Sequence, residues 1–151
     1  MDIDAQPAVL PHLTVDDAAA AIDFYVKAFD AEELVRMPTP SGKIIHAAVK
    51  INGTTVMLAD DFPEMNCGES MTPKALGGNP VTIHLAVTDD IDARFRRALD
   101  AGATEVMPLE DAFWGDRYGV LRDPFGHTWS MGQPVREVSP EEMQEALKQF
   151  A

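Results

Sequence analysis

The stretch P-H-L-T-V-D-D at residues 11–17 recurs, slightly changed, as I-H-L-A-V-T-D-D at residues 83–90. Its histidines, His12 and His84, are 72 positions apart. Each copy joins a short apolar segment, typical of a strand, to an acidic segment, typical of the start of a helix. A fixed offset of this size in a chain of 151 residues indicates two copies of one structural module. His12 and His84 are therefore the first candidates for a site shared by the modules.

The order of elements within each copy is strand, helix and three strands. In the first copy we expect strands at residues 8–15, 32–37, 43–50 and 54–59, with a helix that begins after Asp16 or Asp17. In the second copy we expect strands at residues 81–87, 104–109, 118–122 and 128–131, with a helix that begins after Asp89 or Asp90 and ends at Gly102. Asn52-Gly53 and Asp123-Pro124-Phe125-Gly126 are the hairpin turns.

Two segments lie outside the repeat. Residues 62–80 are rich in proline, glycine and methionine, which is typical of a surface crossover or of a mobile lid. Residues 139–150 begin with Ser139, Pro140 and a glutamate at the third helical position, which together predict a helix start. The apolar stripe of this helix must be buried on its own subunit or on a partner. We expect a single domain at 1–151, made of module 8–61, linker 62–80, module 81–133 and helix 139–150.

Composition limits the classes of partner. The net charge of −13 repels phosphate backbones and anionic membranes, which argues against nucleic-acid and membrane partners. A single cysteine, Cys67, excludes an intrachain disulfide, and residues 1–6 are too polar for a signal peptide. We therefore expect a cytoplasmic protein whose partner is a small molecule.

Three motifs carry a family resemblance: V-D-D-A-A-A-A-I-D-F-Y (residues 15–25), F-W-G-D-R-Y-G (113–119) and D-P-F-G-H-T-W-S (123–130). They resemble the vicinal oxygen chelate superfamily, which includes glyoxalase I, extradiol dioxygenases and the bleomycin and fosfomycin resistance proteins. With the acidic tail at 139–143, the chain looks most like the PhnB-like branch. The resemblance implies an α+β fold in which two βαβββ modules form a curled mixed sheet around a cavity, followed by a C-terminal helix. It also implies a homodimer, in which modules pair within one chain or exchange between two.

The resemblance also maps the metal ligands of metal-dependent relatives, two per module, onto this chain. The positions are Leu10 and Thr82, five before the valines of the repeat, and Met57 and Ser130, four after the hairpin glycines. None of these side chains is a good ligand for a divalent cation, which prefers imidazole, carboxylate or thiolate groups. From the mapped positions we therefore predict that the protein uses no metal and no cofactor.

His12 and His84 lie two residues beyond the mapped ligand positions, and a shift of two keeps a strand residue on the same face. With a carboxylate from Glu110, Asp111 or Asp116 they could form a displaced metal site. They could equally contact a ligand in the cavity, or be structural.

The segment at 113–119 is rich in aromatic residues and glycine. Trp114 and Tyr118 offer flat contact surfaces, and Arg117 could hold an anionic ligand or pair with Asp116. The alternative is a bulged strand whose aromatic side chains fill the core, with Arg117 paired on the surface. Trp129 is expected under a helix, and His127 in a turn or at the surface. The candidate ligand-binding residues are His12, Met57, His84, Trp114, Arg117, Tyr118 and Ser130.

These observations favour a metal-free protein that binds an aromatic or cationic ligand in the cavity between the modules. Three alternatives stay open: a metal-dependent lyase, isomerase or dioxygenase with a displaced site at His12 and His84; a metal-free enzyme with a histidine as general base; and an oligomeric or regulatory module without a working site. Whether the protein is an enzyme is left open.

Overall fold

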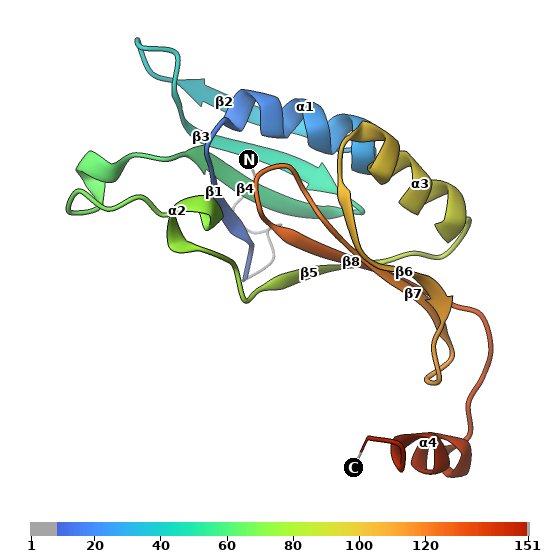
Figure 1. Ribbon diagram of the computed structural model, residues 1–151. Helices are drawn as coiled ribbons and strands as arrows, with labels where there is room; N and C mark the ends of the chain where they lie inside the picture. Colours follow the sequence, from blue (N-terminus) through green and yellow to red (C-terminus); the bar gives the residue numbers. More distant parts are fainter. Residues whose placement is uncertain (1–8, 151) are drawn as a thin grey trace. The chain divides into compact units, whose positions relative to one another are not determined.

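Each half of the chain folds as strand, helix and three strands, in the order that the repeat predicts (Figure 1). The computed structural model describes residues 9–150. The chain divides between Gly78 and Asn79 into two units, each with its own four-stranded mixed sheet. This confirms the predicted α+β class, with two βαβββ modules and a C-terminal helix.

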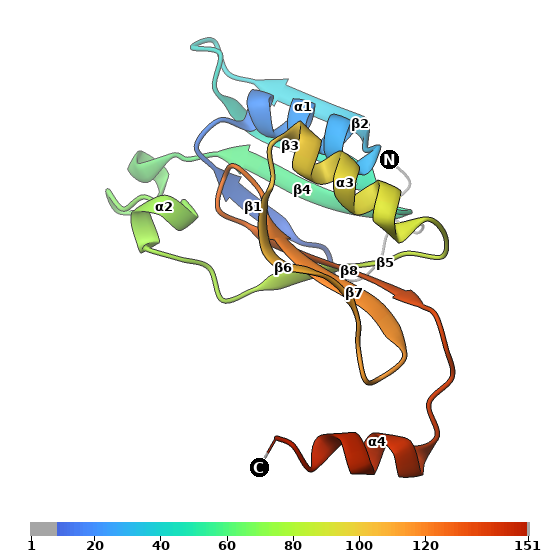
Figure 2. The same ribbon diagram turned by 45° about the vertical axis from the view of Figure 1, so that its right-hand side comes forward.

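The first module pairs its first strand with its last. Its sheet has the order β1-β4-β3-β2, in which β1 and β4 are parallel and the other neighbours antiparallel. The helix α1 packs on one face of this sheet (Figures 1 and 2). The elements are β1 (His12–Val15), α1 (Ala18–Phe29), β2 (Glu32–Pro38), β3 (Ile44–Ile51) and β4 (Thr54–Asp60). The first strand is shorter than predicted, and position 8 lies outside the described residues.

The second module repeats this topology. Its sheet has the order β5-β8-β7-β6, again with the first and last strands parallel, and α3 packs on one face. Trp129 is fully buried, as predicted, and its indole Nε1 donates to the buried Asp123. His127 is not at the surface: it is buried and bonded to Asn79. The elements are β5 (Thr82–Ala86), α3 (Ile91–Ala101), β6 (Thr104–Asp111), β7 (Asp116–Arg122) and β8 (Thr128–Pro134).

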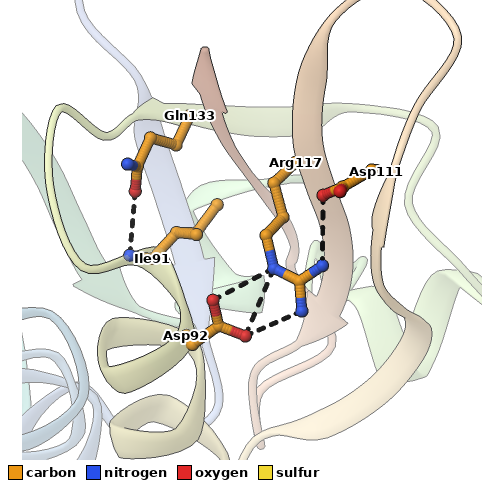
Figure 3. A network of polar contacts seen from close by, with 5 residues as sticks. All are labelled: Ile91, Asp92, Asp111, Arg117 and Gln133. Carbon is orange, nitrogen blue, oxygen red and sulfur yellow. Dashed lines mark hydrogen bonds and ion pairs between the residues drawn. The ribbon is translucent and has the colours of Figure 1, made fainter. Parts of the chain in front are cut away.

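The two module helices begin differently. Asp17 caps α1 as predicted, since its carboxylate accepts from the Ala20 backbone amide at 3.0 Å. Asp90 is the N-cap residue of α3, at one of the two predicted positions, but its backbone is left-handed and its side chain makes no cap bond. The first amide of α3 donates instead to Gln133 Oε1 on β8, at 2.9 Å (Figure 3).

The linker contains more structure than its composition predicts. It holds a 3-10 turn at Pro63–Met65 and the short helix α2 (Pro73–Leu76), which Thr72 caps. The carboxylate of Asp61 accepts bonds from the Ser70 hydroxyl and the Met71 amide, so the linker is tied to the end of the first module.

The C-terminal helix α4 (Pro140–Leu147) begins where predicted and ends three residues early. The Ser139 hydroxyl accepts from the Glu142 amide at 3.1 Å, as a capping serine should. None of the residues of α4 is buried. Within the described part of the chain, no helix is long and apolar enough to cross a membrane.

Candidate functional site

The face of the second sheet opposite α3 gathers most of the predicted site residues. Strand side chains alternate between faces, and the virtual Cβ of Gly119 meets Phe95 of α3, which fixes the α3 side. Tyr118 therefore lies on the open face. The register pairs Tyr118 with Glu110 and Gly132, and it pairs His84 with Ser130.

His84 is held in place by its neighbours on this face. Its Nδ1 lies 2.8 Å from the Ser130 hydroxyl, which is buried, and its ring stacks on Tyr118 at 6.2 Å between centroids. The ring fits only because position 132 is glycine, since a Cβ there would stand 2.9 Å from His84 Cε1. The same point is 3.5 Å from Asp116 Oδ2, so the imidazole edge and this carboxylate border one small space.

Aromatic rings continue from Tyr118 towards the C-terminus. Trp114 meets Tyr118 edge-on at 5.3 Å, and Phe113 meets Trp114 at 5.1 Å. Phe113 in turn contacts Phe150, after the end of α4, at 5.3 Å. The Trp114 indole donates to Asp116 Oδ2 at 3.2 Å, which fixes the ring relative to the carboxylate.

A groove of about 560 Å³ runs between this aromatic row and α4. Most of its lining is apolar or aromatic, and two carboxylates stand at its border. The lining residues are Met107, Pro108, Glu110, Asp111, Ala112, Phe113, Trp114, Tyr118, Leu147 and Phe150.

The carboxylates near the groove are of two kinds. Asp111 forms an ion pair with Arg117 at 3.2 Å. Glu110 and Asp116, on the open face with Tyr118, have no cationic partner among residues 9–150. Their negative charge is available to a ligand.

Arg117 lies on the other face, with its charge already matched (Figure 3). Its guanidinium holds Asp92 of α3 through Nε and Nη2, and Asp111 through Nη1. The bond to Asp92, followed by that to Asp111, raises the pKa of Arg117, and the same contact lowers the pKa of Asp92. This placement matches the alternative in which Arg117 forms ion pairs at the surface. Its partners are Asp92 and Asp111, and not Asp116.

In the first module, His12 and Met57 are neighbours in the parallel register of β1 and β4. His12 is exposed and Met57 is half-buried, on the face opposite α1. The ring of His46 meets His12 edge-on at 6.1 Å. No carboxylate lies in this group.

A metal centre would need at least three suitable ligands. The histidine of each first strand lies beside a residue of the wrong type, Met57 for His12 and Ser130 for His84. Within the described residues, no group of three or more histidine, cysteine, aspartate or glutamate side chains is placed to hold a metal ion. The donor set within either module therefore does not fit a catalytic metal.

The predicted residues thus fall into three groups. His84, Ser130, Tyr118 and Trp114 come together in the second module, His12 and Met57 lie together in the first, and Arg117 stands apart. From the sequence, Glu110 was expected only as a metal ligand and Asp116 as a metal ligand or a partner of Arg117, while Gly132 and Phe150 were not identified as site residues. The pairing of Glu110 with Tyr118 across the β6–β7 hairpin was the available signal for Glu110.

Comparisons with known proteins give this architecture a family. An uncharacterized protein of Mycobacterium bovis is 68% identical over 147 residues, which cover 97% of this chain and 96% of that protein. The crystal structure of TioX from Micromonospora sp. ML1 is 28% identical, with a TM-score of 0.64, and the match covers 88% of this chain and 100% of TioX. A PhnB protein from Bacillus cereus shares the fold at 23% identity, with a TM-score of 0.65, over 84% of this chain and 99% of that one. The family model of the Glyoxalase/Bleomycin resistance protein/Dioxygenase superfamily matches residues 7–131, and the chain belongs to this superfamily.

Proposed function

We propose that this protein binds a small aromatic or cationic molecule on the open face of its second module, without a metal ion. The observation that carries this proposal is the meeting of Tyr118 and Trp114 with two carboxylates, Glu110 and Asp116, that have no cationic partner among the described residues.

The chemistry of the site suits such a ligand. Tyr118 and Trp114 present aromatic faces and edges to a planar ring system and can also attract a positive charge. His84, fixed by Ser130, supplies a polar group at the end of the row. The net charge of −13 raises the local concentration of cations near the molecule.

Tryptophan fluorescence tests the proposal, because the chain has two tryptophans in different environments. Trp129 is fully buried, whereas Trp114 is 39% exposed. We expect 9-aminoacridine, a planar cation, to quench the fluorescence saturably, and anthracene-9-carboxylate, a planar anion of similar size, to have little effect. The Trp114→Phe variant should lose the response. An unchanged response in this variant, or no saturable binding of the cation, would contradict the proposal.

The finer family assignment is part of the same proposal. The PhnB-like branch is supported by the acidic tail at 139–143 and by the shared fold of the Bacillus cereus protein. We also propose a homodimer in the cytoplasm, on the basis of the family resemblance and the single cysteine. Light scattering at micromolar concentration should give twice the mass of the chain, and a monomer would contradict the dimer.

The metal-dependent alternative makes a different prediction. It requires His12 and His84 to bind an ion together with a carboxylate. Metal analysis of protein purified without chelators, before and after addition of nickel, zinc, manganese or iron, should give a stoichiometry near zero. One bound ion per chain would favour the alternative.

A further inference from the structure

We infer that the C-terminal helix α4 is the second wall of this ligand site, and that it closes on a flat, cationic molecule lying in the groove. The inference rests on the proposed function and extends it, because it assigns ligand contact to Leu147 and Phe150, beyond the paired modules.

The first observation is that no residue of α4 is buried against the described part of the chain. A helix of eight residues is too short to be stable without packing, since isolated helices shorter than about 12–15 residues are marginal in water. Its apolar stripe repeats at helical spacing (Met143, Ala146, Leu147 and Phe150), yet Leu147 is 49% exposed and Phe150 is 63% exposed. The strong N-cap and the exposed apolar stripe together indicate that α4 is stabilised by contact with another molecule.

The second observation is the size of the space beside the stripe. Leu147 and Phe150 form one side of the groove, and Trp114 and Tyr118 belong to the other. The volume of about 560 Å³ lies within the roughly 300–1,000 Å³ typical of ligand pockets. A groove of this size suits a small molecule.

The third observation is charge. Glu110 stands at the border of the groove without a cationic partner among residues 9–150, and Asp116 holds Trp114 on the same side. The outer face of α4 adds the carboxylate of Glu141, whereas that of Glu145 is paired with Lys148. A second copy of a chain with net charge −13 would add like charge here, whereas a cation would be attracted.

The fourth observation couples α4 to the aromatic row. The segment that leads into α4 is bonded to the β6–β7 turn, since the Val135 and Arg136 amides both donate to the Gly115 carbonyl, at 2.9 and 3.2 Å. Contact there is close: a Cβ at Gly115 would stand 2.5 Å from the Arg136 carbonyl oxygen. The side chain of Arg136 pairs with Glu142 of α4. The turn that carries Trp114 therefore also anchors the segment that leads into α4. A ligand that contacts Trp114 would affect the position of α4 through this turn.

The test compares two double variants of the same helix. Leu147→Ser with Phe150→Ser removes the wall, and Glu145→Ser with Lys148→Ser makes a matched change on the opposite face. Because α4 contributes no buried residue, both variants should fold, which circular dichroism and thermal unfolding can verify. We expect calorimetry to show that the wall variant binds 9-aminoacridine at least about tenfold more weakly than the wild type, whereas the control stays within about twofold. In the wild type, the ligand should slow hydrogen exchange of the α4 amides.

The outcomes separate this inference from the proposed function. If the wild type does not bind 9-aminoacridine, both are overturned. If the wild type and the wall variant bind it equally, only the role of α4 is overturned. If α4 is protected from exchange without ligand, and sedimentation shows a dimer that the wall variant converts to a monomer, then a second copy covers the stripe and the inference is wrong.

Discussion

The two modules share a scaffold and differ on their open faces. In both, a side chain from the last strand accepts a bond from the first amide of the module helix, Asp60 from Ala18 and Gln133 from Ile91. Both pairs of equivalent residues are 73 positions apart. The hairpin glycines, Gly53 and Gly126, show the same offset. The framework that positions each helix on its sheet is therefore the conserved part of the repeat.

The open faces carry different chemistry at equivalent pairing positions. In the first module Met37 pairs with His46, and in the second Glu110 pairs with Tyr118. Ile44 lies two residues before His46, and Asp116 lies two residues before Tyr118. An apolar pair in one module thus corresponds to two carboxylates in the other.

The turn between the second and third strands also carries different side chains in the two modules. The turn at 39–43 closes on itself, since the Thr39 hydroxyl contacts Ser41 and donates to the Lys43 carbonyl. The turn at 112–115 is closed by the same pattern of backbone bonds, but it carries Phe113 and Trp114. The repeat therefore encodes the scaffold, while the proposed ligand site depends on residues that the repeat does not share.

The largest expected effect concerns the scaffold. Asp60 accepts two amide bonds through its charged carboxylate, from Ala18 at 2.7 Å and Ile44 at 2.6 Å, whereas Gln133 accepts one through a neutral amide. We expect Asp60→Ala to lower the free energy of unfolding by about 3 kcal/mol and Gln133→Ala by about 1 kcal/mol. Urea unfolding followed by circular dichroism measures both. Equal losses would show that Asp60 and Gln133 stabilise their modules to the same extent.

The next prediction concerns ligand binding at the two equivalent aromatic positions. Tyr118→Ala removes the ring between His84 and Trp114, so affinity for 9-aminoacridine should fall by about 30-fold, a loss of about 2 kcal/mol. His46→Ala in the first module should bind as the wild type does. Calorimetric titration of both variants gives the comparison. A similar loss in both would place the ligand on both modules.

A smaller effect is expected at Gly132, for which the first module has Ala59. A methyl group at Gly132 would stand 2.9 Å from His84 Cε1, so Gly132→Ala should displace the ring and break its bond to Ser130. We expect a loss of about 1 kcal/mol in stability, because the histidine can rotate away. The imidazole signals of His84 in NMR spectra should shift. Unchanged signals would show that the fit at Gly132 is looser than the geometry indicates.

The smallest effect concerns Asp92 and pH. Arg117 lowers the pKa of Asp92 below its ordinary value near 3.8. The pair therefore stabilises the folded state above that pH, and this stabilisation is lost as the pH falls through the lowered pKa. Because Asp92 is exposed and Arg117 is partly exposed, Asp92→Asn should reduce the stability slightly at pH 7 and not at all at very low pH. Thermal unfolding across the acid range measures the difference, and an equal effect at all pH values would count against the ion pair.

Local patterns in the sequence predicted the elements well, because they depend on neighbouring residues. The duplicated motif, the cap at Ser139 and the burial of Trp129 follow from such patterns and are confirmed. The acceptor for the first amide of α3 was not predicted, because Gln133 lies 42 residues from the amide it binds. The opposite placement of Arg117 and Tyr118 follows from strand alternation once the position of α3 is known.

The groove beside α4 could not be predicted, because it depends on how an extended segment returns a helix to the β6–β7 turn. The apolar stripe gave the correct signal that α4 needs a partner surface, but no sequence pattern identifies that surface. Likewise, the hydrogen bonds of Asp61 that order the linker join residues nine and ten positions apart, outside any local helix or turn rule.

We propose that only the second module holds the ligand, and chemical-shift mapping tests this most directly. A ¹H–¹⁵N NMR titration with 9-aminoacridine should shift the backbone amides of Glu110, Trp114 and Tyr118, with those of α4. The amides of His12, His46 and Met57 should stay in place. Shifts of equal size around these first-module residues, or confined to them, would show that the first module binds the ligand.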